Sequence, residues 1–481
     1  MCLACPMTRT PTTKATAPAC SPEAAFTYSD LFAGIGGFHA ALSGMGGECV
    51  YAVEIDERAA RVYQQNWNHN PLGDITSVAG EDGVDTSAIG PHDVLAAGFP
   101  CQPFSKSGAQ KGMEETRGTL YFNILQVVRQ HHPTVLLLEN VRNLAGPRHR
   151  HEWDVIIRTL RDEGYHVSDT PAILSPHQIA ADHGGRPQVR ERVFITATHD
   201  PQGIGGPDSQ PVARPREIYG SQSAPWNIED ILDDEGEETA RYALTPAETL
   251  WIDAWDDWVH LFREHNAPGT RLPGFPIWVD AWADVEAFER SVEAGEHENT
   301  PAWKLGFLRK NAELFTENDA WIREWEKRWK VHDFPPSRRK LEWQAQDTAS
   351  LWQCLMHLRP SGLRAKRPTY VPALVAITQT SIVGPRGRRL TPRETARLQG
   401  LPDSFSFDGQ PDASTYKQLG NGVNVGVVWN ILKRHCERDA EILADSERGR
   451  RILDAVRRAP DNPDGPVSAA LHLAQQAATH G

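Results

Sequence analysis

A single cysteine, Cys101, stands directly after a proline, between an apolar segment and a polar loop punctuated by glycines. Residues 93–97 predict a buried parallel strand, so we expect the thiol just beyond its carboxyl end, where open α/β sheets bind their ligands. Pro100 restricts the backbone there and holds the thiol in place. Cysteine is also a common inert core residue, so this feature alone indicates a nucleophile no more strongly than a packing role.

Two further segments place charged side chains at strand ends. Glu139 follows the apolar run 136–138, and glutamate is rarely buried without a function. Arg190 and Arg192 precede the strand-like run 193–197, and strand alternation places both arginines on one face. Two guanidinium groups that point the same way suit an anion, or a carboxylate that must be oriented. The sequence therefore predicts a reactive site at these strand ends.

A glycine turn near the start of the chain predicts a ligand site. Residues 28–38 read as a first strand that turns through Gly34 and Gly36 into a helix, which lets a ligand approach the backbone closely. The glycine spacing is not that of a dinucleotide fingerprint, and no phosphate-binding Gly-Lys-Ser follows. A second strand, 49–53, ends in Glu54, about twenty residues past the turn, where such folds place an acid on a ribose hydroxyl. The pattern indicates a nucleoside ligand with little or no phosphate.

Together these segments resemble the DNA (cytosine-5) methyltransferases, from roughly Phe26 to His435. One block could arise by chance, but several in the order of the family are a specific signal. The blocks are the glycine turn of residues 30–38, Pro100-Cys101-Gln102, Glu139-Asn140-Val141, Gln188-x-Arg190-x-Arg192 and, after a long variable stretch, residues 389–400 and 418–423.

The resemblance implies covalent catalysis on a cytosine. The Cys101 thiolate would add to carbon 6 and make carbon 5 nucleophilic enough to accept a methyl group. A free thiol ionises near ~8.5, so a cation such as Arg192 would help it. Glu139 would contact ring nitrogen 3 and the exocyclic amine, and burial would help it keep a proton near neutral pH. Arg192 would orient Glu139, and Arg190 would support this pair or contact a phosphate.

The same resemblance implies S-adenosylmethionine as the methyl donor. Position 55 is isoleucine where the family often has an aromatic residue, which puts one wall of the expected adenine site in question. For Asp74 and Asn421 the alternative is turn chemistry, because Gly-Asp and Asn-Gly are ordinary turn pairs. The family's cofactor roles fall on Phe32 for stacking near the adenine, Gly34 and Gly36 for close backbone approach, Glu54 for the ribose hydroxyls, Asp74 for the adenine amine and Asn421 for the same pocket.

A cytosine inside a duplex must be flipped out before a thiol can reach it. The loop at residues 105–112 carries glycine hinges and lysines, which suits closure over DNA, and a plain surface loop is the alternative. From this region and its flanks we expect DNA contacts by Gln102, Ser105, Ser107 and Arg117.

The net charge of −13 argues superficially against a nucleic-acid partner, because phosphate binding depends on Lys and Arg. The distribution matters more than the total. Acidic residues concentrate in 229–238, whereas residues 348–393 contain no Asp or Glu. We expect that basic segment to be the main DNA surface, with contacts by Arg364, Lys366 and Arg367.

At 481 residues the chain is long enough for two domains. We expect an α/β fold, the Rossmann-like, mostly parallel sheet of S-adenosylmethionine-dependent methyltransferases with an inserted target-recognition domain. Tryptophans at helical spacing, 251/255/258 and 321/325/329, favour core packing over exposed stacking platforms. The expected division is a disordered tail at 1–25, a catalytic and cofactor-binding domain at 26–199, a target-recognition domain at 200–385, a return to the catalytic domain at 386–436 and a helical tail, frayed at its end, at 437–481.

No run of eighteen apolar residues and no secretion signal occurs, and seven scattered cysteines suit a reducing compartment. We therefore expect a cytoplasmic protein without a membrane partner or a metal site. The expected partner is double-stranded DNA, with a separately acting restriction endonuclease if the protein is the modification enzyme of a restriction system rather than an orphan.

Three alternatives compete with this interpretation. A tRNA cytosine methyltransferase would share most of the motifs, but the long inserted domain argues against it. A catalytically inactive DNA-binding homologue is disfavoured by intact Cys101, Glu139 and Arg192. A zinc deaminase, which also acts on a flipped base, would need a Pro-Cys-x-x-Cys pair, and position 104 is Phe.

Overall fold

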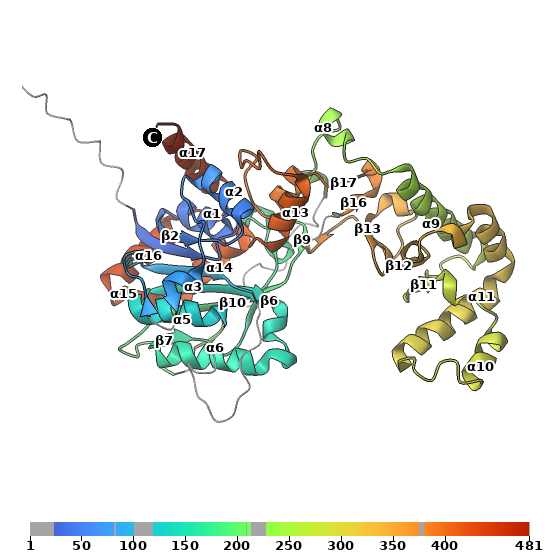
Figure 1. Ribbon diagram of the computed structural model, residues 1–481, viewed down its shortest axis with the longest axis horizontal. Coiled ribbons are helices and arrows are strands. Elements are labelled where there is room, and N and C mark those ends of the chain that lie inside the picture. The colour runs from blue at the N-terminus through green and yellow to red at the C-terminus, as the bar shows by residue number, and fades with distance from the viewer. Residues whose placement is uncertain are drawn as a thin grey trace, which may run out of the picture.

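The computed structural model describes residues 24–80, 83–100, 119–207, 209–212, 228–374 and 380–480. These residues form two parts, each built around its own sheet and lying side by side in Figure 1. The first part holds both ends of the described chain, and the second lies between them in the sequence. The expected α/β class with an inserted domain is confirmed by this arrangement.

The first sheet has the strand order β2-β1-β5-β6-β10-β7, and β8 also pairs with β10. Its first four strands are parallel, and β10 runs antiparallel to β6, β7 and β8. Such a sheet is mostly parallel and is covered on both faces, which explains its continuous apolar strands. The strands are β1 (Phe26–Leu31), β2 (Gly47–Val53), β5 (Val94–Gly98), β6 (Val135–Val141), β7 (Tyr165–Val167), β8 (Ala172–Leu174) and β10 (Arg192–His199).

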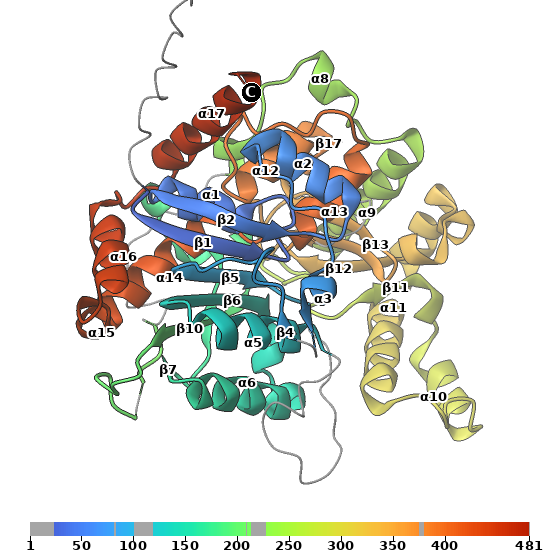
Figure 2. The ribbon, with the colours of Figure 1, turned by 60° about the vertical axis from the view of Figure 1, so that its left-hand side comes forward.

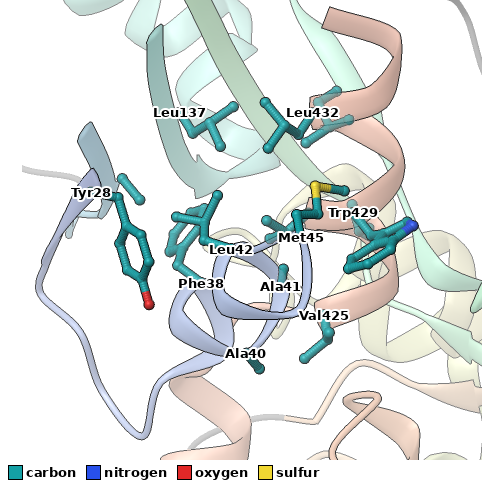
Figure 3. Packing of buried hydrophobic residues seen from close by; sticks show 14 of the residues in the cluster. Tyr28, Phe38, Ala40, Ala41, Leu42, Met45, Leu137, Val425, Trp429 and Leu432 are labelled. Atoms are coloured by element: carbon teal, nitrogen blue, oxygen red, sulfur yellow. The ribbon is translucent and has the colours of Figure 1, made fainter. Parts of the chain in front are cut away.

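Helices cover both faces of this sheet, and each face has its own apolar core (Figure 2). One face packs against α3 (Ile75–Val78), α5 (Leu120–His131) and α6 (Arg150–Asp162). The other packs against α1 (Gly37–Gly44), α2 (Glu57–Trp67), α14 (Val425–Arg438), α16 (Glu447–Arg458) and α17 (Asp464–His480). Figure 3 shows Phe38 and Leu42 of α1 packed with Trp429 and Leu432 of α14.

The C-terminal helices belong to this core. Ile452 and Leu453 of α16 are buried in it, as are Val467 and Leu471 of α17. Helix α17 contacts both α1 and α2, which come from the other end of the chain. The sequence predicted a helical tail with a frayed end, whereas the structure places these helices against the sheet domain.

The second sheet has the order β11-β12-β14-β13-β16-β17 and ends at Arg389, four residues beyond the boundary expected at 385. Helices α9 (Pro246–His265) and α11 (Ala302–Trp329) pack on one of its faces. Trp255, Trp258 and Trp325 are fully buried there, which confirms the predicted core packing. The strands are β11 (Ile277–Trp278), β12 (Lys340–Gln344), β13 (Leu355–Arg359), β14 (Gly362–Lys366), β16 (Ile382–Val383) and β17 (Arg388–Arg389).

A short parallel pair joins the two parts: β9 (Gln188–Val189) pairs with β15 (Val371–Pro372). The remaining elements are β3 (Ala79–Gly80), β4 (Gly83–Val84), α8 (Glu237–Ala240), α10 (Val285–Glu293), α12 (Pro392–Leu398), α13 (Asp412–Asn421) and α15 (Ala440–Ala444). Within the ranges described, no helix has both the length and the apolar character that a membrane span needs.

Candidate active site at the strand ends

A cavity of about 470 Å³ opens at the carboxyl ends of β1, β2, β5 and β6. This is the sheet edge at which α/β proteins bind ligands. Most of the described residues expected at the site line it together, although they come from segments far apart in the sequence. They are Phe32, Gly34, Glu54, Asp74, Pro100, Glu139, Arg192 and Asn421.

The glycine turn forms one wall of the cavity. Phe32 has φ 59° and Gly34 has φ 57°, so the chain leaves β1 with a left-handed residue on each side of Ala33. A side chain at Gly34 would meet no atom within 4 Å, so the backbone there is open to a ligand. Gly36 does not line the cavity, and a Cβ at that position would lie 2.3 Å from Nε1 of Trp67. Gly36 therefore lets α2 pack against the turn.

Glu54 is held rigidly at the end of β2. One carboxylate oxygen accepts a hydrogen bond from the backbone N–H of Gly34 at 2.8 Å, and the other accepts one from Asp56 N–H at 2.8 Å. Each oxygen keeps a second lone pair. The carboxylate is thus fixed in orientation and retains acceptor capacity for two hydroxyl donors in the cavity.

Asp74 caps a helix and lines the cavity at once. Its Oδ1 accepts a hydrogen bond from Thr76 N–H at 2.9 Å at the start of α3. This is the turn chemistry named as the alternative for Asp74. The side chain also lies among the lining residues, so the two interpretations are compatible.

Glu139 and Arg192 form an ion pair in the cavity wall, with 3.0 Å between Arg192 Nε and Glu139 Oε1. Antiparallel pairing of β6 with β10 brings them together. Burial raises the pKa of Glu139 above its ordinary value, although Arg192 and Arg190 oppose the rise. Asn140 Nδ2 donates to Phe99 O at 2.8 Å, which ties this strand end to the segment that leads to Pro100.

Arg190 is buried behind the cavity. Its Nη2 donates to the carbonyls of Gly420 at 2.8 Å and Gly422 at 2.6 Å, and its Nη1 donates to Leu374 O at 3.1 Å. Burial lowers its pKa to about 9, and the nearby Arg192 adds to that effect. Among the described residues Arg190 forms no hydrogen bond or ion pair with Glu139 or Arg192, and its guanidinium instead fixes the backbone on both sides of Asn421.

Cys101, Gln102, Ser105, Ser107 and Arg117 lie outside the described residues. Pro100, which directly precedes Cys101, lines the cavity together with Glu139 and Arg192. The chain therefore reaches the cavity at the residue directly before the predicted nucleophile.

Three residues of the second sheet form what we call the cationic face: Arg359 on β13, and Arg364 and Lys366 on β14. Register pairs Arg359 with Gly362 and Leu355 with Lys366, so all three share one side of the sheet. His357, the register partner of Arg364, lies on the same side, but burial lowers its pKa to about 3 and keeps its ring neutral. The alternate residues, such as Leu358 and Leu363, face the tryptophan core. Figure 1 shows these strands lying between the first domain and helices α9 and α11.

Acidic residues from outside the basic segment neutralise part of its charge. Arg364 pairs with Glu342 at 2.6 Å, and Arg367 forms an ion pair with Asp347. For Arg359 and Lys366 no ion-pair partner is present in the described part of the chain. Burial and the nearby Arg364 and Arg359 lower the pKa of Lys366. The accessible charge is therefore smaller than the sequence indicated.

The acidic run 229–238, whose role the sequence left open, supplies several of these partners. Glu229 and Glu235 pair with Arg386 at 2.5 Å and 3.4 Å, and Asp233 pairs with Arg397 at 2.6 Å. The run thus fastens the segment before α9 to the end of the second sheet and to α12. The opposite charges of the two segments were the only sequence signal for this contact.

The fold and the cavity define a class: an α/β enzyme with its polar site at parallel strand ends, joined to a second domain that carries a cationic sheet face. The chain belongs to the C-5 cytosine-specific DNA methylases, whose family model matches residues 26–437, and it is a DNA cytosine-5 methyltransferase.

Individual relatives agree with the family match. The chain is 50% identical over 516 aligned residues to the Type II methyltransferase M.AluI of Cellulosimicrobium cellulans, covering 93% of this chain and 98% of that one. It is 29% identical to the Type II methyltransferase M.HpaII of Haemophilus parainfluenzae, over 86% of this chain and 90% of that one. Among solved structures, the S. pombe Dnmt2 methyltransferase is 18% identical, with a TM-score of 0.44 and coverage of 86% and 98%.

Proposed function

We propose that the protein transfers the methyl group of S-adenosylmethionine to carbon 5 of a flipped cytosine in a specific duplex DNA sequence, through a covalent bond from Cys101 to carbon 6. One observation carries the proposal. The buried Glu139–Arg192 pair stands in the cavity wall beside Pro100, the residue directly before Cys101.

The residues of the cavity suit the proposed methyl donor. A volume of about 470 Å³ is in the range of small-ligand sites. Glu54 offers a fixed carboxylate for a ribose diol, Asp74 an acceptor for an amine, and Phe32 an aromatic ring. Arg190 holds the backbone around Asn421 against the same cavity. When bound there, S-adenosylmethionine would supply an electrophilic methyl group.

The protein groups then have defined tasks. The Cys101 thiolate adds to carbon 6 of the cytosine, and the electron pair of the 5,6 double bond becomes available at carbon 5. Glu139 shares its proton with ring nitrogen 3, which reduces the negative charge that the addition develops. Arg192 keeps the Glu139 carboxyl group oriented. After carbon 5 has gained the methyl group, loss of the carbon 5 proton expels the thiolate and restores the ring.

DNA would lie between the catalytic cavity and the cationic face. Lys and Arg on the open side of β13 and β14 suit contact with phosphates and guanine edges. Near the flipped base the proposed contacts are Gln102, Ser105, Ser107 and Arg117. In this assignment residues 26–199 and 386–436 form the catalytic domain, and residues 200–385 carry most of the target recognition.

Two relatives are Type II methyltransferases by name, which supports a role as the modification enzyme of a restriction system. A cognate endonuclease would act separately on the same DNA sequence. Such an enzyme modifies chromosomal DNA, so we place the protein in the cytoplasm.

The test is methylation of duplex DNA by purified protein with labelled S-adenosylmethionine. We expect Cys101→Ser to lower turnover by at least about 10³-fold, as the removal of other enzyme nucleophiles does, while cofactor affinity stays nearly unchanged. Cys20→Ser, outside the family match, is the control. A duplex with 5-fluorocytosine at the target should leave an adduct on Cys101, visible by mass spectrometry. Wild-type turnover in Cys101→Ser would rule out the covalent route.

A further inference from the structure

The outer edge of the second sheet carries two lysines around one tryptophan. Lys340 on β12 is the register partner of Trp278 on β11, the edge strand. Its Nζ lies 3.6 Å from the centroid of the Trp278 ring, and Nζ of Lys304 lies 5.6 Å from it. Two ammonium groups are thus held close together by one indole ring.

Helix α11 is fixed across this edge. Asn311 is fully buried, accepts a hydrogen bond from Trp278 N–H at 2.7 Å and donates to Pro276 O at 3.0 Å. About two turns before that contact, Trp303 is 67% exposed and makes an edge-on contact with Phe307. Most of the described tryptophans of this domain are buried in its core or packed against it, so Trp303 is an exception that core packing does not explain.

Lys304 and Lys340 bring two positive charges to this edge, and Asp280 brings a negative one, because its Oδ2 accepts a hydrogen bond from Trp278 Nε1 at 3.3 Å. For Lys304 and Lys340 no ion-pair partner exists among the described residues. Two nearby acids are already engaged, because Asp280 pairs with Arg339 at 2.9 Å and Glu289 with Arg309 at 2.9 Å.

The edge continues the cationic face. Lys340 lies two residues before Glu342 on β12, so both point to the same side of the sheet. Glu342 is in turn the register partner of Arg364. A duplex seated on the cationic face would therefore meet Lys340 next if it extends toward β11.

We propose that Trp303, Lys304 and Lys340 bind the sugar–phosphate backbone of duplex DNA outside the recognised sequence. The inference rests on the proposed function, because it needs the target duplex to lie on the cationic face. The two ammonium groups would contact phosphates as point charges, and the exposed indole would pack on deoxyribose. Such contacts are independent of base sequence and add affinity only when flanking DNA is present.

The experiment compares two duplexes centred on the methylated sequence, which bisulfite sequencing of modified DNA identifies. One duplex just covers the target, and the other is longer by about one helical turn on each side, roughly 10 base pairs. We expect the wild-type protein to bind the longer duplex more tightly. In the variant W303A/K304Q/K340Q we expect most of that gain to be lost, about tenfold in Kd, and the slope of log Kd against log salt to fall by about 2 for the longer duplex.

The control is Lys327→Gln, an exposed lysine at the opposite end of α11, which should keep the gain. An equal loss on both duplexes, or no loss on the longer one, would overturn the inference. So would sedimentation showing that Trp303→Ala separates a dimer, because the patch would then join copies of the chain. Failure of the proposed function would give a different result: the wild-type protein would methylate neither duplex. That result would also remove the basis of this inference.

Discussion

The two sheets of the protein use charge in opposite ways. At the first sheet the charged groups at the catalytic end of the cavity are largely desolvated, and Glu139, Arg190 and Arg192 each have a fixed partner. At the second sheet the charges lie on an open face above a tryptophan core, and some, such as Lys366, have no ion-pair partner among the residues described. Catalysis needs oriented groups with shifted pKa values, whereas DNA binding needs cations that can exchange counterions for phosphates.

Glu139→Gln tests whether the desolvated carboxyl group at the first sheet acts in catalysis. If the buried proton matters, kcat should fall by about 10²- to 10⁴-fold, the usual contribution of general acid–base catalysis. Burial raises the pKa of Glu139, so the protonated form persists to higher pH than for an ordinary carboxyl group. Wild-type kcat should therefore decline as the pH rises through that raised pKa, whereas the variant should lack this decline. Single-turnover methylation across pH measures both effects.

Glu191→Gln is the matched control for that experiment. Glu191 lies between the two arginines in sequence, but it pairs with Arg142 at 2.5 Å and does not line the cavity. An unchanged kcat in Glu139→Gln would contradict the proposed role of the buried carboxyl group.

A second prediction concerns Arg190, at the junction of the two parts. Lysine cannot reproduce the contacts of the guanidinium with Gly420, Gly422 and Leu374. We expect Arg190→Lys to raise the Kd for S-adenosylmethionine about tenfold, in proportion to the loss of a charged buried hydrogen bond. Isothermal titration calorimetry measures the Kd for S-adenosylmethionine in both proteins.

Arg186→Lys is the control for Arg190→Lys, because Arg186 also donates to backbone carbonyls, those of Arg397 and Gly185, but does not line the cavity. If Arg190→Lys lowers the melting temperature without changing cofactor affinity, Arg190 stabilises the fold and does not position the Asn421 segment.

On the second sheet the expected effects are smaller. Lys366→Gln should weaken binding to all duplexes by a few-fold and reduce the salt slope by about 1, because a single phosphate contact is lost. Lys327→Gln should change neither quantity. A loss that depends on the base sequence would instead show that Lys366 reads a base.

The last prediction concerns the open wall of the cofactor site. Ile55 lines the cavity and is 70% exposed, so the wall there is open. Ile55→Trp should add aromatic contact worth about 0.5–1.5 kcal/mol, or roughly a two- to tenfold lower Kd for S-adenosylmethionine. Leu72→Trp, also exposed but not a lining residue, should have no effect. Weaker binding in Ile55→Trp would show that no adenine ring lies against this wall.

The sequence predicted the strand-end residues because motif order constrains them, whereas strand alternation wrongly placed Arg190 on the same face as Arg192, since residue 190 lies between β9 and β10. Glu139 and Arg192 were expected to meet, and they form an ion pair. The tryptophan spacing predicted the second core for a similar reason, since helical periodicity specifies which residues share a face.

Contacts between distant segments could not be predicted in the same way. Arg190 binds carbonyls more than 180 residues away, and the acidic run pairs with arginines about 150 residues beyond it. Such pairs depend on how the elements pack, which local patterns do not encode. Gly36 was expected to let the cofactor approach the backbone, but it makes room for Trp67 instead. Trp67 is far from Gly36 in the sequence and reaches it only when α2 packs against the turn.

The position of α17 has a consequence for biosynthesis. Its apolar side covers α1 and α2, which leave the ribosome some 400 residues earlier. Until α17 has been synthesised, the surface of α1 and α2 that it covers stays exposed to solvent or is bound by a chaperone. We expect fragments that end before α17 to aggregate more readily than the full chain.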